Sequence, residues 1–305
     1  MKMTYAEAAR EALAEMMRED PTVWAVGEDL GRGGVFGQYK GLREEFGAAM
    51  AGTRPIGEMR FADFALCATD ELVNQIAKAR FMFGGQSRAP MVIRKPMGMW
   101  RSSAAQHSQS LESWYTHIPG LVVCCPSTPQ DNYAMLKAAI ACDDPVVYLE
   151  HKNIWAMEGE VDTSVAGAFG RAAVRRVGRD VTLVGWSDAA NNCAAAAEAL
   201  AGEGIEAEVI DLISLWPWDK QAVLDSVAKT GRLVVAHESV GVGGFGAEVV
   251  ATVVQRAFSA LKAPPIRAAA PRSLIAHAPN LEDQLRVTLG KIAAAARQTL
   301  EPETV

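Results

Sequence analysis

Short apolar runs alternate with helix-like segments along almost the whole chain, and this alternation limits the possible folds more than any other feature. In the first half, residues 61–83 and 108–118 have helical periodicity, and the strand-like runs are residues 89–95, 121–126 and 145–150. Apolar strands that alternate with helices are typical of a parallel sheet covered on both faces. We therefore predict an α/β fold of the doubly wound type.

A second alternating set follows a stretch rich in glycine and alanine. Residues 159–180 have no clear period, which is typical of a linker or an extended crossover. A chain of 305 residues with 50% apolar content can bury more than one core. We predict two doubly wound domains, residues 1–160 and 179–305, joined by a linker over residues 161–178.

Charge and cysteine usage exclude several classes of protein. The net charge of -6, without a basic run, argues against a nucleic-acid partner, and no stretch resembles a membrane span. The first helix, which Thr4 and Glu7 should cap, carries both signs of charge, unlike a signal or transit peptide. The five cysteines lack metal-ligand spacing and a CxxC pair, so we expect small buried residues. These features predict a soluble protein of the reducing cytoplasm.

Glycines at positions 241, 243 and 246 spell G-x-G-x-x-G between a strand and a helix. In that context the pattern is known from dinucleotide-binding sites, where glycines let backbone N–H groups approach a pyrophosphate. The acidic residue expected about twenty positions later is missing from this chain. We favour a tight strand-to-helix turn and keep a nucleotide-binding protein as a distant alternative.

His107 lies among small and polar residues after the strand-like run 89–95. A metal site is disfavoured, because His107 and His117 lack a convincing spacing for shared ligation. An accessible imidazole that titrates near neutral pH is suited to general acid–base chemistry. A histidine that only satisfies hydrogen bonds in a loop is the alternative, and the residues alone leave both open.

Recognisable motifs occupy residues 27–47, 60–78, 106–132, 206–239 and 243–248. In these stretches the sequence closely resembles the β subunit of thiamine-diphosphate-dependent 2-oxo-acid dehydrogenases. The pyruvate, branched-chain and acetoin dehydrogenase β subunits form this group, and the resemblance runs nearly end to end. It implies a pyrimidine-binding domain followed by a transketolase C-terminal domain, in agreement with the two predicted domains.

The resemblance implies one subunit of the decarboxylating component of a pyruvate-like 2-oxo-acid dehydrogenase complex, active only with an α subunit in an α2β2 heterotetramer. In that family the α subunit holds the diphosphate through magnesium with a Gly-Asp-Gly motif, and that tripeptide is missing from this sequence. Self-association and a lipoyl acyltransferase core are the other implied partners. An acetoin dehydrogenase β subunit is the alternative, although the bulky Met99 and Trp100 weakly favour a small substrate.

Three residues match positions of the family's active site. Phe64 matches the aromatic residue that packs on the aminopyrimidine ring of thiamine diphosphate, although Phe61 and Phe64 also fit the buried face of a helix. Arg60 matches a position in the same pocket where relatives carry varied residues. His107 matches the histidine that donates a proton during reductive acylation of lipoamide, so the resemblance favours proton transfer.

The resemblance also implies a structural potassium ion that is held largely by backbone carbonyl groups. Because such ligation depends little on the side chain, Cys142 in place of the usual aspartate weakens this prediction without excluding it. The matching positions are Met91, Ala139, Ile140, Cys142 and Asp144.

One departure from the family lies between Gly47 and Ala48. Relatives carry there a strand, a turn and a helix start, with the glutamate that activates the cofactor. Neither Glu44 nor Glu45 is in a context to replace it, since both belong to a polar helix face. Either the given sequence omits residues that the protein contains, or this chain is a non-catalytic pseudo-subunit. We favour the first explanation, because losing a core strand leaves the backbone groups of its neighbours unpaired.

Overall fold

The computed structural model describes residues 1–27 and 54–301 and divides into two compact units. The first unit contains residues 1–100 and 106–169, and the second contains residues 101–105 and those from Gly170 onward. The predicted linker is not free of secondary structure, because residues 173–176 form a strand of the second unit. None of the described helices combines the length and the hydrophobicity that a bilayer crossing requires.

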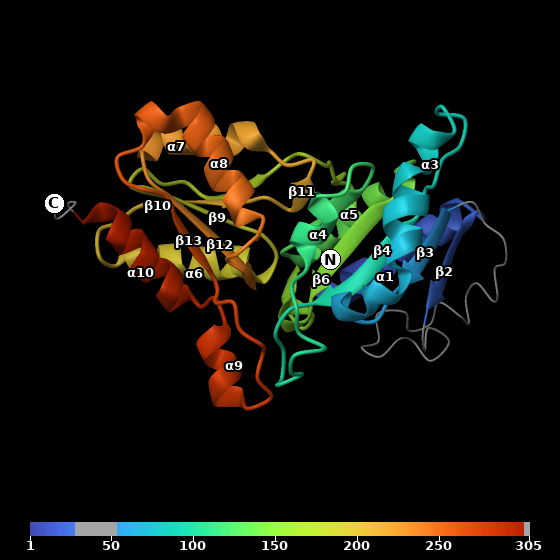
Figure 1. Ribbon diagram of the computed structural model, residues 1–305, viewed down its shortest axis with the longest axis horizontal. Coiled ribbons are helices and arrows are strands. Elements are labelled where there is room, and N and C mark those ends of the chain that lie inside the picture. The colour runs from blue at the N-terminus through green and yellow to red at the C-terminus, as the bar shows by residue number, and fades with distance from the viewer. Residues whose placement is uncertain (28–53, 302–305) are drawn as a thin grey trace. The chain divides into compact units, whose positions relative to one another are not determined.

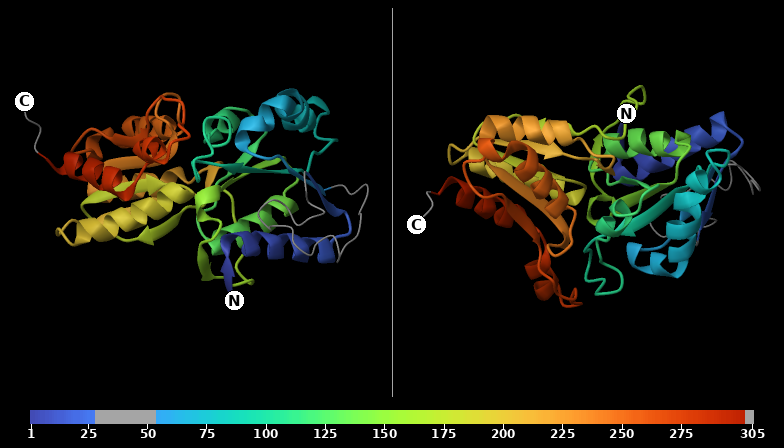
Figure 2. Two further views of the ribbon diagram at one scale, coloured as in Figure 1. Left: turned by 90° about the horizontal axis from the view of Figure 1, so that it is seen from below. Right: turned by 45° about the horizontal axis from the view of Figure 1, so that its top comes forward.

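The first unit is a parallel sheet with the order β5-β6-β4-β3-β2, and it is covered by helices (Figure 1). Figure 2 shows α1 and α5, which pack against each other, on one face, and the segment that ends in α3 on the other. A short antiparallel pair joins β1 to β7. In chain order, the elements are β1 (Lys2–Thr4), α1 (Tyr5–Glu19), β2 (Val23–Gly27), β3 (Arg54–Glu58), η2 (Ala62–Ala68), η3 (Glu71–Ile76), α3 (Ala77–Met82), β4 (Val92–Met97), α4 (Glu112–Thr116), β5 (Val122–Cys124), α5 (Pro129–Ala141), β6 (Val146–His151), η4 (Lys152–Ile154) and β7 (Glu158–Glu160).

The second unit has the strand order β13-β12-β9-β10-β8, in which only the pairing of β8 with β10 is antiparallel among the described strands. Helices α6 and α10 pack together on one face, and α7 and α8 on the other (Figure 1). The doubly wound α/β prediction is confirmed. The elements are β8 (Ala173–Arg176), β9 (Val181–Gly185), α6 (Asp188–Ala201), β10 (Ala207–Asp211), β11 (Ser214–Trp216), α7 (Lys220–Thr230), β12 (Leu233–Val240), α8 (Gly246–Ala257), η5 (Phe258–Ala260), β13 (Ile266–Ala270), α9 (Pro279–Leu285) and α10 (Leu289–Leu300).

The two main helices of the first unit begin with capping boxes. At α1 the predicted box is confirmed: the Glu7 backbone N–H donates to Thr4 Oγ1 at 3.1 Å, and the Thr4 N–H donates to the Glu7 carboxylate at 2.9 Å. At α5 the capping residue is Thr128. Thr128 forms the reciprocal pair with Asp131, because these two are three positions apart, as a capping box requires.

Two charged residues form an ion pair in the middle of the first sheet. Arg94 on β4 and Glu150 on β6 are 1% and 3% exposed. The Arg94 Nε and Nη2 atoms donate to the two carboxylate oxygens of Glu150 at 2.9 and 2.8 Å. Asn132 of α5 also donates to Glu150, at 3.2 Å. Because the sheet is buried on both faces, this contact holds β4 and β6 in register where water cannot screen the charges.

The cysteine prediction holds for part of the set. All five cysteines are free, and Cys124, Cys125 and Cys193 are buried as expected. Cys67 is exposed and Cys142 is half-buried. For these two the prediction was wrong, because the sequence pattern does not show which face of an irregular helical turn or which side of a helix end is covered.

Candidate functional site

The loop that carries His107 joins β4 to α4 and is closed at its base by backbone contacts. Gly98 directly follows β4, and its N–H donates to the carbonyl oxygen of Gln109 at 3.3 Å. Gly98 has a φ of +87°, and a Cβ atom there would lie 1.9 Å from the imidazole of His151. Only glycine fits this turn, because it adopts positive φ without strain and leaves room for the ring.

Two phenylalanine rings surround the imidazole of His107. The His107 ring centroid lies 4.7 Å from that of Phe61 and 5.1 Å from that of Phe64, both edge to face. The Phe64 side chain is 42% exposed, so an apolar ring face stays open beside the imidazole. Phe61 has a φ of 52°, a conformation that costs a non-glycine residue about 1–3 kcal/mol. The structure therefore brings together His107 and Phe64, two residues that are 43 positions apart, as the shared site requires.

Two buried polar side chains hold the loop around His107. Lys152, which is 1% exposed, donates from Nζ to the carbonyl oxygen of His107 and lies 4.6 Å from the centroid of the Phe61 ring. Asp63 is 6% exposed and accepts hydrogen bonds from Gln109, from Nε2 at 2.7 Å and from the backbone N–H at 3.3 Å. These contacts tie the backbone of the His107 loop to the residue after β6 and to the segment that carries Phe61 and Phe64.

Lys152 and Asp63 were missed by sequence analysis, although one signal pointed to Lys152. It directly follows β6, and His107 lies in the loop after β4, the strand that pairs in parallel with β6. Carboxyl ends of neighbouring parallel strands meet at one edge of a sheet, which is where ligands bind in such folds. Arg60 directly precedes Phe61 and is half-buried, so it belongs to the same segment, and its role stays a prediction.

A buried lysine lies near the base of the same loop. Lys95 on β4 is 0% exposed, and its Nζ donates to the Tyr115 hydroxyl of α4 at 2.9 Å. Burial lowers the pKa of Lys95 to about 7. Burial, with a smaller contribution from Asp63, raises the pKa of Tyr115. Lys95 therefore changes its charge near neutral pH, where an exposed lysine keeps its proton.

We expect the variant Lys95→Met to lose a pH dependence of stability that the wild type has. The folded-state pKa of about 7 lies below the ordinary 10.5, so between these values only the unfolded chain holds the proton. The unfolding free energy therefore rises with pH between these two pKa values. Below about pH 7, Lys95 contributes no pH dependence, because both states hold the proton. Each pKa unit corresponds to about 1.4 kcal/mol, so the effect is on the order of a few kcal/mol.

Thermal unfolding between about pH 7 and about pH 10 measures this effect as the difference between wild type and variant. The half-buried Lys78 of α3 offers a matched control, and Lys78→Met should follow the wild-type pH dependence. Parallel pH curves for wild type and Lys95→Met would contradict the prediction.

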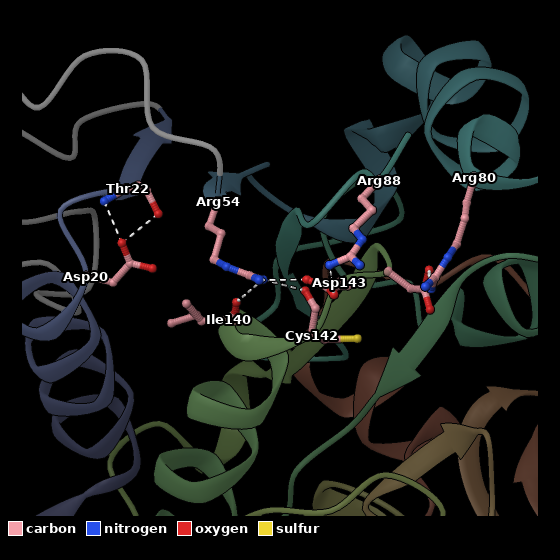
Figure 3. Close-up of polar contacts among 9 residues, drawn as sticks. Asp20, Thr22, Arg54, Arg80, Arg88, Ile140, Cys142 and Asp143 are labelled. Atoms are coloured by element: carbon pink, nitrogen blue, oxygen red, sulfur yellow. Dashed lines mark hydrogen bonds and ion pairs between the residues drawn. The ribbon is translucent and has the colours of Figure 1, made fainter. Parts of the chain in front are cut away.

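Two of the five residues predicted for potassium contact an arginine that was not predicted. Figure 3 shows Arg54 Nη1 donating to the carbonyl oxygens of Ile140 at 3.1 Å and Cys142 at 2.9 Å. The Ala139 carbonyl accepts from Cys142 N–H at 3.3 Å, and the Met91 carbonyl from Val146 N–H at 2.8 Å. A guanidinium group therefore already contacts two of the five predicted carbonyl groups.

The glycine-rich turn of the second unit packs against a buried histidine. His237 is 0% exposed, and burial lowers its pKa to about 4, so the ring is neutral. A Cβ atom at Gly244 would lie 2.6 Å from the nearest atom of this ring, and one at Gly246 would lie 2.5 Å from it. This close packing explains Gly246, and Gly243 has a φ of +69°, so a tight strand-to-helix turn accounts for two glycines of the motif.

Comparisons with known proteins cover nearly the whole chain. Residues 1–156 match the family described as "Transketolase, pyrimidine binding domain", and residues 170–292 match "Transketolase, C-terminal domain". A solved structure, "Split gene transketolase, inactive beta4 tetramer", has a TM-score of 0.77 at 20% identity and covers 98% of both chains. At that identity the likeness supports the fold alone.

Curated relatives are more similar in sequence. The acetoin:2,6-dichlorophenolindophenol oxidoreductase subunit beta of Cupriavidus necator is 40% identical, with 98% of both chains covered. The 2-oxoisovalerate dehydrogenase subunit beta of Bacillus subtilis is 36% identical, with 98% of this chain and 99% of the relative covered. The pyruvate dehydrogenase E1 component subunit beta of Rhizobium meliloti is 37% identical, with 97% of this chain and 69% of the relative covered.

The alignment with the Cupriavidus necator protein bears on the departure noted between Gly47 and Ala48. It spans 331 positions, 26 more than the 305 residues of this chain, so the relative contains residues without a counterpart here. The junction itself, with Glu44 and Glu45, lies outside the described residues.

Proposed function

Because the chain belongs to the transketolase-like family, among the β subunits of 2-oxo-acid and acetoin dehydrogenases, we propose that it contributes half of a thiamine diphosphate site. An α subunit completes that site in an α2β2 assembly and holds the diphosphate through magnesium. A lipoyl acyltransferase core then receives the acyl group. The observation that carries the proposal is the placement of the His107 imidazole against the exposed ring of Phe64.

The residues present fit the aminopyrimidine half of the cofactor. Phe64 offers an exposed, flat apolar surface, the kind of group on which an aromatic ring packs. His107 lies beside that surface, on a loop that Lys152 and Asp63 hold in place. Bound thiamine diphosphate supplies the electron sink for decarboxylation of a 2-oxo acid.

The side chain of His107 is an imidazole, the group most often used as a general acid or base in catalysis. Its position beside the cofactor surface suits it to deliver a proton to the lipoyl sulfur while the acyl group is transferred. The Phe61 and Phe64 rings exclude water around it, which strengthens the electrostatic effect of each proton transfer. Arg60 and the five-residue potassium set stay predictions of the resemblance.

The test is reconstitution of the chain with its α subunit, thiamine diphosphate and magnesium. We expect decarboxylation of a small 2-oxo acid such as pyruvate, measured by reduction of a dye and by acylation of lipoamide. Phe64→Ala should weaken binding of the cofactor, measured by calorimetry, and the exposed Trp114 provides a control as Trp114→Ala. Failure of the assembly to bind thiamine diphosphate would contradict the proposal.

Acetoin cleavage is the second candidate function, and the 40% identity to the acetoin-linked relative favours it. Turnover of acetoin, with none of pyruvate or 2-oxoisovalerate, would establish this alternative. Binding of the cofactor without turnover of any substrate would instead identify a non-catalytic subunit. That outcome would follow if the segment missing between Gly47 and Ala48 is absent from the protein.

A further inference from the structure

We propose that the guanidinium group of Arg54 is the resident cation of residues 139–144, in place of the potassium ion that the family resemblance predicts. This proposal concerns the stability of the first unit and does not depend on the proposed catalytic function. Figure 3 shows the contacts that carry it.

The guanidinium contacts two of the five carbonyl groups that the predicted ion would use. Arg54 Nη1 donates to the carbonyl oxygens of Ile140 and Cys142 at 3.1 and 2.9 Å, and Nη2 donates to Asp143 Oδ1 at 2.7 Å. These carbonyl groups lie at the C-terminal end of α5, where the last carbonyls of a helix lack partners within the helix and attract positive charge. A planar group with five N–H donors can satisfy several of them at once.

Arg54 is held in position by its own backbone. It opens β3 and pairs with Val23 of β2, and its N–H donates to the carbonyl oxygen of Thr22 at 3.2 Å. The side chain is 23% exposed, so it reaches the end of α5 from a fixed strand. A cation that the chain itself supplies needs no ion from solution.

A potassium ion bound to the same oxygens would lie close to this guanidinium. Each carbonyl has a second lone pair, so hydrogen bonding alone leaves room for an ion. The charges decide against it, because two like charges a few ångströms apart repel, and more strongly near a protein surface than in bulk water.

The carboxylates of these residues are already paired with arginines. Asp143 contacts both Arg54 and Arg88, and Asp144 contacts Arg80 at 2.6 Å. The Arg54 hydrogen bond, with the charges of Arg88 and Arg80, holds the pKa of Asp143 below its usual range. An added ion would therefore meet carboxylates whose charge is already balanced.

Thermal unfolding of the full-length chain tests the proposal in potassium, sodium and choline chloride at equal ionic strength. We expect the wild-type Tm to agree within about 1 °C in the three salts, since an ion that binds only the folded state would raise it. We expect Arg54→Met to lower the Tm by about 5 °C or more, because two carbonyl groups and a carboxylate lose a charged donor. Arg88→Met is the matched control. It removes the other partner of Asp143 but leaves the carbonyl contacts, so its Tm should fall by no more than about 2 °C.

A saturable rise of the wild-type Tm that only potassium produces would overturn the proposal. Equal Tm values for Arg54→Met and Arg88→Met would also overturn it. If Arg54→Met does not fold, elemental analysis of the dialysed wild-type protein decides. A potassium content well below one ion per chain would support the proposal, and a content of about one ion per chain would refute it.

Discussion

Replacing His107 with alanine is expected to lower the rate of lipoamide acylation by the reconstituted enzyme about 10²–10⁴-fold, the range that a positioned acid–base group contributes. The imidazole lies 5.1 Å from the Phe64 ring, and Lys152 and Asp63 hold its loop from two sides. Removing the ring removes a proton donor but leaves the exposed aromatic face. Binding of thiamine diphosphate should therefore change little, and calorimetry measures it separately from turnover.

His117 provides a matched control for this experiment. It is the second histidine of the segment that carries His107, and it is exposed at the end of α4. We expect His117→Ala to keep both lipoamide acylation and cofactor binding. Unchanged acyl transfer in His107→Ala would remove the catalytic role of this residue, whereas loss of cofactor binding would assign it a binding role instead.

Glu150→Gln is expected to reduce the free energy of unfolding of the first unit by about 3–5 kcal/mol. Glu150 is 3% exposed and accepts two hydrogen bonds from the 1% exposed Arg94. The variant keeps the size of the side chain but leaves the arginine charge buried without its carboxylate partner. Breaking such a pair is costly, because the remaining charge loses its counterion and gains no water.

Two further variants separate this effect from a general loss of contacts. The pair Arg297–Glu203 in the second unit is 43% exposed on both sides, so Glu203→Gln should cost much less stability than Glu150→Gln. The double replacement Arg94→Met with Glu150→Met removes both charges and should be more stable than Glu150→Gln. Denaturant unfolding compares the three variants with the wild type. Because the chain has two units, calorimetry then separates the unfolding of one unit from that of the other. A loss in Glu150→Gln no larger than in Glu203→Gln would contradict the prediction.

The positions of most helices and strands followed from sequence periodicity, and the exceptions have physical causes. Residues 61–83 show one helical pattern, but the chain there forms a 3₁₀-helix, a π-helix and the short α3 in succession. The positive φ of Phe61 and the buried contacts of Asp63 set this irregular geometry, and neither is visible in a repeat of apolar residues. Likewise, the C-terminal helical segment is divided into α9 and α10 by residues 286–288.

The candidate site was predictable only in part. His107 and Phe64 were found through the resemblance of their motifs, and the structure places their rings together. Lys152 and Asp63 were not found, because neither belongs to a distinctive pattern and both act through contacts with distant residues. Arg54 was missed for the same reason, since its partners at Ile140 and Cys142 are 86 and 88 positions away.

The sequence by itself predicted the α/β architecture, the order of most elements and the family, and through the resemblance it pointed to His107 and Phe64. These depend on periodicity, capping and motifs, which act between residues close together in the chain. Only the tertiary structure showed that buried Lys152 and Asp63 contact the His107 loop, and that Arg54 donates to carbonyl groups at the end of α5. Those partners are brought together by parallel strand pairing, whose contacts join residues far apart in the chain and leave no local pattern.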